Sequence, residues 1–434
     1  MLPTEAFMQS CYLPFHCVGK GYMSKFFSRA RQPLFLAAVV ASLAACGGGF
    51  ISGDKAMMPE GCASLSGASP ANGQEEGRPV TAIACGVMKD LDLRSAIIQV
   101  SIGGRLIYSA ALGESAPGMP ATTDMHFRNG AIAMSYMSMV LLQLVDENRL
   151  SLSDTVGKWL PDLPAADKVS LEMLANHTSG YPDYVADPEF LAAAKADPLR
   201  EWSAGELMSY AFNKPLIYPP GTNWNYSHTN YLILGDVIER VTGKQLAEVI
   251  AERILDPLQL RNTASSVMPD ISPPVLRAYT SERGSYEEST FWNPSWTMPA
   301  GAVMTTDITD LRISAEAIMS GRLLSSKSLA AQTDARLVGL GDPDACPPGI
   351  CKRNTELAHY GMGLLVSGPW LMQSPLFDGY SASIGMLPER GISIAVAATQ
   401  GPGADPDRNG SEVLMMAISR HMAPDKPVPL GGAQ

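Results

Sequence analysis

The stretch HFRNGAIAMSYM, residues 126–137, opens the longest apolar run of the chain and is central to its fold. The run continues to about residue 148 and is typical of a helix buried on all sides. A helix N-terminus carries a partial positive charge, so a short polar lead-in to such a helix is a good place for a nucleophile. Ala131 and Met134 lie at the start of this helix, one turn apart and therefore on the same face.

Strand-like segments lie at both ends of the chain. Residues 96–112 (AIIQVSIGGRLIYSAAL) contain two β-rich runs around Gly103-Gly104, which predicts a hairpin. Three more strand-like runs come late in the sequence: GMGLLVSG, GYSASIGMLP and GISIAVAAT.

Helical patterns fill the region between these strands. Ser170 is expected to cap a short helix, and Ser203 with Glu206 forms a capping-box pattern at the start of another. Two further helices are expected on either side of Gly243, and a last helix covers about residues 410–422.

This order predicts an α/β fold of the α+β type. An antiparallel sheet is built from both ends of the chain, about residues 82–128 and 356–425, and is flanked by helices. A mostly helical region, about residues 129–355, is inserted between them, and residues 426–434 form a tail. A cleft between sheet and helical region is the expected ligand site.

Residues 1–45 are expected to be a targeting segment rather than part of the fold. A basic stretch precedes the apolar run 33–45, which is too short to cross a bilayer as a mature helix. Met23 directly precedes this complete pattern and is an alternative start.

The end of this segment, Leu-Ala-Ala-Cys46, resembles the cleavage site of bacterial lipoproteins. The resemblance implies cleavage before Cys46, acylation of that residue and a flexible tether over residues 46–81. Gly47, rather than an aspartate, resembles lipoproteins sorted to the outer membrane of Gram-negative bacteria, which predicts a periplasm-facing protein. The alternative is an ordinary secretory signal in which Cys46 has no role.

Four other cysteines remain in this oxidising compartment: Cys62, Cys85, Cys346 and Cys351. The local pairings Cys62–Cys85 and Cys346–Cys351 are favoured among the three that four cysteines allow. A zinc site is the rival interpretation, but no Cys-x-x-Cys occurs and the six histidines are scattered. The net charge of −11, without a basic cluster, argues against a nucleic-acid partner.

Six segments follow one another in a recognisable order: FRNGAIAMSYMSMVLLQLVDENRLSLSDTVGKWLP, LEMLANHTSGYPDY, YPPGTNWNYSHTNYLILGDVIERVTGK, PAGAVMTTDITDL, YGMGL and GYSASIGMLPERGISIAVAATQ. Together they resemble the serine β-lactamase and penicillin-binding-protein-like family, nearest its class C and esterase-type members. The similarity covers about residues 85–420 and implies a β-lactamase/transpeptidase-like fold. It implies no metal or organic cofactor.

The family's first motif, Ser-x-x-Lys, aligns with Ala131 and Met134. In the family the serine hydroxyl attacks the substrate and the lysine takes its proton. Alanine has no nucleophilic atom and a thioether has no proton chemistry, so the motif is absent. Ser135 and Ser138 lie one and two turns further along the helix; small polar filler in a core helix is the favoured interpretation of both.

The second motif, Tyr-x-Asn, aligns with Tyr226-Ser227-His228, so the tyrosine is kept and histidine replaces the amide. A phenol beside an imidazole could still transfer protons. The alternative is a hydrogen-bonded loop pair in a former pocket.

The third motif, Lys/His-Thr-Gly on an edge strand facing the cleft, aligns with Gln373-Ser374-Pro375. A proline on that strand would remove a backbone donor and disturb substrate pairing.

Residues that shape the scaffold are kept while those that carry chemistry are lost. The turns at residues 177–180 and 219–221 and the glycines Gly130 and Gly363 survive. This pattern predicts a lipoprotein that has lost acyl-enzyme chemistry and binds a peptide, a cell-wall fragment, a small apolar molecule or a partner protein. Two alternatives stay open: an active serine hydrolase with an unidentified nucleophile, and a purely structural envelope protein.

Overall fold

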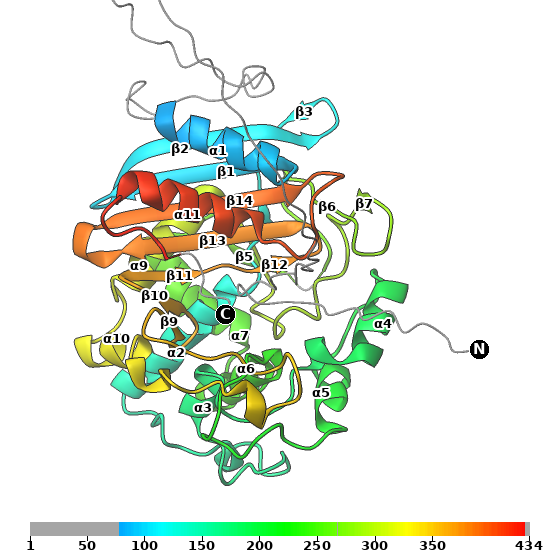
Figure 1. Cartoon of the computed structure of the whole chain (residues 1–434). Coiled ribbons are helices and arrows are strands. Elements are labelled where there is room, and N and C mark those ends of the chain that lie inside the picture. Colours follow the sequence, from blue (N-terminus) through cyan, green and yellow to red (C-terminus); the bar gives the residue numbers. More distant parts are fainter. Residues whose placement is uncertain (1–77, 267, 430–434) are drawn as a thin grey trace, which may run out of the picture.

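The computed structural model describes residues 78–266 and 268–429. In this part of the chain the main sheet has nine strands in the order β3-β2-β1-β14-β13-β11-β10-β9, with β12 beside β13 (Figure 1). The strands are β1 Leu93–Ile102, β2 Arg105–Ala116, β3 Met119–Pro120, β9 Ala358–Tyr360, β10 Leu365–Ser367, β11 Trp370–Gln373, β12 Leu376–Phe377, β13 Tyr380–Leu387 and β14 Ile392–Gln400.

The two ends of the described chain meet at the centre of this sheet. The β1 strand pairs antiparallel with β2 on one side and with β14 on the other, so that Ile98 lies opposite both Ala110 and Val396. The expected antiparallel sheet with contributions from both ends of the chain is therefore confirmed.

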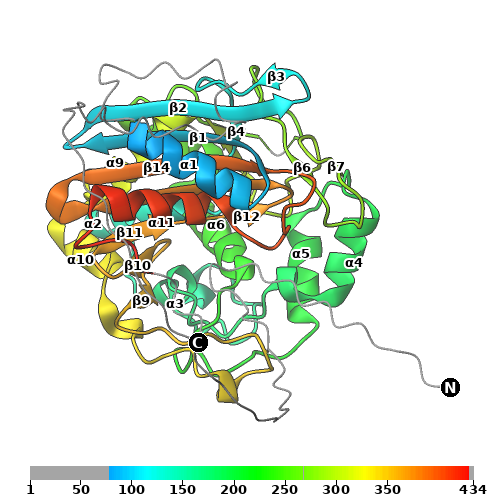
Figure 2. The same ribbon diagram turned by 45° about the horizontal axis from the view of Figure 1, so that its top comes forward.

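Helices cover both faces of the sheet, which is why its central strands are buried on both sides. The α1 helix (Arg78–Asp90) and the α11 helix (Gly410–Met422) lie side by side on one face, and α9 (Ile308–Met319) lies on the other (Figures 1 and 2). Alternate residues of β1 point to α9, where Gln99 Nε2 donates to Thr309 Oγ1 at 3.1 Å and Ser101 Oγ donates to Glu316.

The inserted region is mostly helical and lies below the sheet in Figure 1. Its helices form at the expected places: Ser170 caps α3, Ser203 and Glu206 form the capping box of α5, and Gly243 ends α6 with a φ of 73°. The helices are α2 Ile132–Asp146, α3 Leu171–Ala175, α4 Pro188–Ala196, α5 Ala204–Phe212, α6 His228–Thr242, α7 Leu246–Ile250, α8 Asp256–Leu258 and α10 Ser326–Gln332, with a π-helical turn, Ala251–Leu255, between α7 and α8.

Two small sheets lie outside the main sheet. The β4 strand (Phe127–Arg128) pairs with β8 (Met304–Thr306), which also pairs with β5 (Ala264–Ser265). The β6 strand (Tyr279–Thr280) pairs with β7 (Glu287–Glu288). Because β4 directly precedes α2, it fixes the entry of the chain into the central helix.

The structure corrects both predicted domain boundaries. The tether was expected to reach residue 81, but α1 begins at Arg78, and Thr81 Oγ1 lies 2.8 Å from the Tyr108 hydroxyl. This helix start was not predicted because proline at position 79 is typical of a loop, although proline is also well tolerated in the first turn of a helix. At the other end the described part of the predicted tail, residues 426–429, is packed, since Trp370 Nε1 donates to the Lys426 carbonyl at 2.8 Å and Val428 is buried.

The predicted signal segment, Cys46 and the tether up to residue 77 lie outside the described residues. Within the described ranges, none of the helices has the length and apolar character needed to cross a membrane.

Candidate functional site

The start of α2 brings two of the three motif positions into contact. Ala131 is the N-cap of this helix, is partly buried and makes no side-chain capping hydrogen bond. Gly130 beside it has a φ of +52°, and a Cβ there would lie 2.6 Å from Phe377 Cε1 and 2.9 Å from Pro375 Cβ. The segment that follows β11 therefore packs directly on the glycine that precedes Ala131.

Tyr226 of the second motif also contacts the α2 helix. Met134 is fully buried, and the Tyr226 hydroxyl donates to its Sδ at 3.1 Å. Burial raises the pKa of Tyr226 well above its usual value, so the phenol stays protonated and acts as a donor. The structure thus brings Gly130, Ala131, Met134, Tyr226 and Pro375 together, and we call these residues the motif cluster.

His228 has a different partner from the one expected. Its ring lies 5.1 Å from the Tyr226 ring at 80°, an edge-to-face contact, while the Tyr226 hydroxyl donates to Met134. Its Nδ1 lies 3.1 and 3.2 Å from the two carboxylate oxygens of Asp183, and its backbone N–H donates to Asp183 Oδ1 at 3.1 Å. The imidazole is therefore held by a carboxylate rather than by the phenol.

Sequence reasoning missed Asp183. This residue caps the short 3-10 helix Tyr184–Ala186, and its Oδ1 accepts from the Val185 N–H at 3.2 Å. The Pro-Asp that follows the turn at 177–180 was the available clue, because aspartate is a strong helix-capping residue. Its proximity to His228, 45 positions away, depends on the packing of two loops.

His177 organises the backbone of the second motif. Its ring is fully buried, and Nδ1 accepts from the Ser227 N–H at 3.2 Å. Burial lowers the pKa of His177 well below its usual value, and the neighbouring His228 lowers it further, so the ring is neutral. A neutral ring that accepts from the backbone at Ser227 holds Tyr226 and His228 in place.

The two serines further along α2 are structural. Ser135 donates to the Gly363 carbonyl at 2.5 Å, and Ser138 Oγ lies 2.8 Å from the Tyr231 hydroxyl. Both serines are fully buried. A buried hydroxyl bonded to a carbonyl or a phenol has no base to activate it, so the filler interpretation of both residues is supported.

The third motif does not lie on an edge strand. Gln373 ends β11, and β10 and β9 lie beyond β11 in the sheet, so the prediction of an edge position was wrong. Pro375 follows the strand and breaks no strand pairing of β11; its carbonyl accepts from the Ala382 N–H at 3.2 Å. Gln373 Nε2 instead donates to the Gly363 carbonyl at 3.3 Å.

Ser374 lies against a buried acid. Its hydroxyl donates to Glu412 Oε2 at 3.0 Å, and its carbonyl accepts from Asn409 Nδ2 at 2.8 Å. Burial raises the pKa of Glu412 to about 8. These bonds tie the third motif to the N-terminus of α11, whose N-cap is Asn409.

The Cys346–Cys351 pairing is confirmed, since the two sulfurs are bonded. The Cys62–Cys85 pairing stays a prediction because Cys62 lies outside the described residues. In residues 78–266 and 268–429, no group of three or more His, Cys, Asp or Glu side chains is arranged to hold a metal ion.

The family model named Beta-lactamase matches residues 80–414 of the chain, and the matched range contains the whole motif cluster. The chain belongs to the beta-lactamase family. Ala131 and Met134, a methyl group and a thioether, align with the family's Ser-x-x-Lys motif, and this alignment stays a prediction.

Several known beta-lactamase-family proteins are similar to the chain. Esterase EstB from Burkholderia gladioli is 27% identical over 188 residues, which cover 40% of this chain and 48% of the esterase. A Salmonella agona protein with a provisional name of D-alanyl-D-alanine carboxypeptidase is 27% identical over 191 residues, 42% of this chain and 44% of that protein. The matched segments thus span under half the length of these relatives.

Solved structures show the same fold over a larger share of the chain. The D-stereospecific amidohydrolase from Streptomyces sp. is 26% identical with a TM-score of 0.66, covering 79% of this chain and 98% of that one. The octameric penicillin-binding protein homologue from Pyrococcus abyssi has a TM-score of 0.65 at 20% identity, covering 82% of this chain and 79% of that one. The β-lactamase/transpeptidase-like fold is thereby confirmed.

Proposed function

We propose that this protein is a lipid-anchored, periplasm-facing member of the beta-lactamase family that binds a ligand or partner without forming an acyl-enzyme. The observation that carries the proposal is the start of α2, where Ala131 and Met134 replace the nucleophile and its base. No other hydroxyl takes over this role in the described part of the cluster, because Ser135 and Ser138 are bonded within the core.

The surroundings of Met134 support a binding role. In an intact family member a cation or amine would stand where the thioether now accepts the Tyr226 hydroxyl. A methionine at position 134 makes this part of the motif cluster apolar, while the residues around it keep their places. Because the named activities of the relatives concern D-alanyl-D-alanine carboxypeptidation and D-stereospecific amide hydrolysis, a peptide or cell-wall fragment is the ligand class we favour.

A second candidate function comes from the Asp183–His228 pair. A carboxylate that holds Nδ1 of an imidazole leaves Nε2 as a base, which could activate water without a covalent intermediate. Such an enzyme would hydrolyse esters through His228 and would form no adduct. Both candidate functions therefore predict that no covalent adduct forms, and they differ in whether the protein hydrolyses esters.

We expect the wild-type protein to form no covalent adduct with a fluorescent penicillin or a fluorophosphonate, because loss of a nucleophile costs about 10⁶ in kcat. Gel fluorescence and intact mass would measure the adduct, with a catalytically intact family member as positive control. Hydrolysis of p-nitrophenyl acetate should be equal in wild type and His228→Ala. A stoichiometric adduct on a serine would overturn the proposal, and a loss of hydrolysis confined to His228→Ala and Asp183→Asn would favour the second candidate.

The membrane anchor is a separate prediction. Cys46→Ala should move the protein from the membrane fraction to the soluble fraction, because two or more acyl chains supply the anchoring energy and one chain alone is marginal. Fractionation of cells followed by immunoblotting measures this, and Cys62→Ala is the matched control that should stay with the membrane. Unchanged partitioning of Cys46→Ala would exclude lipidation at this residue.

A further inference from the structure

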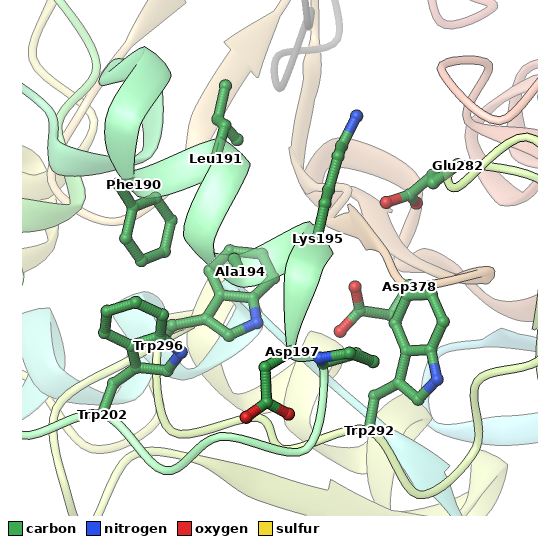
Figure 3. Close-up of a pocket in the computed structure, with 11 residues that line it drawn as sticks. Phe190, Leu191, Ala194, Lys195, Asp197, Trp202, Glu282, Trp292, Trp296 and Asp378 are labelled. Carbon is green, nitrogen blue, oxygen red and sulfur yellow. The ribbon is translucent and has the colours of Figure 1, made fainter.

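A pocket with tryptophan walls and acidic side chains lies next to the motif cluster. Its lining includes Trp202, Trp292, Trp296, Asp197, Glu282 and Asp378, which we call the aromatic–acid pocket (Figure 3). The α4 helix closes one side with Phe190 and Leu191. The pocket adjoins the cluster through Phe377, whose ring lies 6.4 Å from that of Trp296 and packs on Gly130.

Asp378 is the unusual residue of this pocket. It is 8% exposed, and its backbone has a φ of +48°, which a residue other than glycine adopts at a cost. Within residues 78–266 and 268–429, no hydrogen bond or ion pair to its carboxylate is found, and Figure 3 shows the carboxylate turned toward the side where Asp197 and Lys195 lie. A buried carboxylate without a partner is costly unless something positive joins it.

The charges around Asp378 leave it without a full counter-charge. Burial, and after it Glu282, raises the pKa of Asp378 well above its usual value, so the carboxyl keeps its proton until a cation lies beside it; Arg128 opposes the shift. Arg128 forms no ion pair with Asp378 within 4 Å among the described residues, and Lys195 has its ammonium group turned away from both Asp197 and Asp378 in Figure 3. The pocket lining thus holds three acidic side chains, Asp197, Glu282 and Asp378, and one cation, Lys195.

The tryptophan rings of the pocket already attract cations within the chain. The Arg200 guanidinium lies 3.9 Å from the Trp202 ring centroid, and that of Arg283 lies 5.7 Å from the Trp292 centroid. Both arginines have their own carboxylate partners outside the pocket lining, Glu206 at 2.9 Å and Glu287 at 3.4 Å. They therefore do not neutralise the acids of the pocket, while the rings offer π faces to a further cation.

We propose that the aromatic–acid pocket binds a small organic ammonium group, with Asp378 as its counter-ion and the tryptophan rings as its walls. The ammonium belongs to an apolar or aryl amine, because the walls offer rings and aliphatic carbons rather than further ligands for a bare metal ion. An anion would meet three acidic side chains and a single lining cation, Lys195, and is disfavoured. This inference deepens the proposed binding role and rests on it, by naming the chemical class that the site recognises.

Isothermal titration of the full chain in non-ionic micelles tests this with three probes of similar shape: benzylammonium, benzyl alcohol and phenylacetate. We expect saturable binding of benzylammonium, binding of the alcohol weaker by about tenfold or more, and no binding of phenylacetate. Equal affinity for the alcohol, or no saturable binding of benzylammonium up to about 10 mM, a concentration near the weak end of the affinity scale, would overturn the proposal.

Three variants test which residues determine the affinity for benzylammonium. Asp378→Asn keeps the shape and tolerates a positive φ, and it should weaken benzylammonium binding about tenfold or more without unfolding the protein. Lys195→Gln removes the competing wall cation and should strengthen binding a few-fold. Glu201→Gln, an exposed neighbour outside the pocket lining, is the matched charge control and should bind as wild type does.

An unchanged affinity of Asp378→Asn would overturn the assignment of the counter-ion and with it the proposal. The outcome is independent of acyl-enzyme chemistry: a protein that forms a penicillin adduct and still binds benzylammonium would refute the proposed function and leave this inference standing.

Discussion

The double variant Ala131→Ser/Met134→Lys is expected to form a covalent adduct with a fluorescent penicillin, whereas the wild-type chain forms none. The helix start at position 131 is only partly buried, and its φ of −64° and ψ of −1° are ordinary for serine, so the change is tolerated by α2. Its hydroxyl would stand at the positive end of the helix, where a developing negative charge is stabilised.

The lysine at position 134 would supply the base. Met134 is fully buried and its described polar neighbour is the Tyr226 hydroxyl, so the new amine would have no carboxylate partner there. Burial without a counter-ion lowers a lysine pKa, which gives a neutral amine able to take a proton. Such general-base assistance contributes about 10²–10⁴ to the rate.

Gel fluorescence, intact mass and mapping of the labelled peptide measure the adduct, which should fall on position 131. Ala131→Ser alone is the control: it has the oxygen without the base and should label about 10² more slowly or not at all. A double variant that melts cooperatively but stays unlabelled would show that Pro375 and Phe377, which pack on Gly130, close the site.

The second large effect concerns pH and Glu412. The pKa of this carboxyl is raised from 4.5 to about 8 by burial, so the folded protein holds a proton that the unfolded chain releases between these values. Its contribution to stability is fully present below about pH 4.5 and is lost as the pH rises through about 8. The free energy of unfolding should therefore fall from about pH 5 to about pH 9, by on the order of 4 kcal/mol from this group.

Glu412→Gln should remove this part of the slope, because the amide keeps an acceptor for the Ser374 hydroxyl and does not ionise. Urea unfolding at several pH values measures the difference between the variant and the wild type. The comparison must be a difference, since burial raises the pKa of Asp378 as well. Identical slopes in the two proteins would contradict the assignment, and Asp405→Asn, at an exposed site, is the matched control.

Much of the site was predictable because its residues are close in sequence or lie within one motif. The alignment of Ala131 and Met134 with the Ser-x-x-Lys motif and the core positions of Ser135 and Ser138 follow from local patterns and residue chemistry. The partner of His228 did not follow, because Asp183 reaches it from another loop. The edge-strand prediction for Gln373 failed because the order of strands in a sheet depends on long-range pairing. The β10 strand, within the predicted run GMGLLVSG, and the three-residue β9 strand extend the sheet past β11.

The sequence by itself determined that both ends of the chain build one antiparallel sheet, the helix caps at Ser170, Ser203 and Gly243, and the side chains at positions 131 and 134, a methyl group and a thioether. These are properties of local periodicity, backbone conformation and side-chain chemistry. Only the tertiary structure decided that Asp378, Trp202 and Trp296 line one pocket. Their proximity depends on how distant loops pack, and such long-range contacts leave no periodic trace along a single chain.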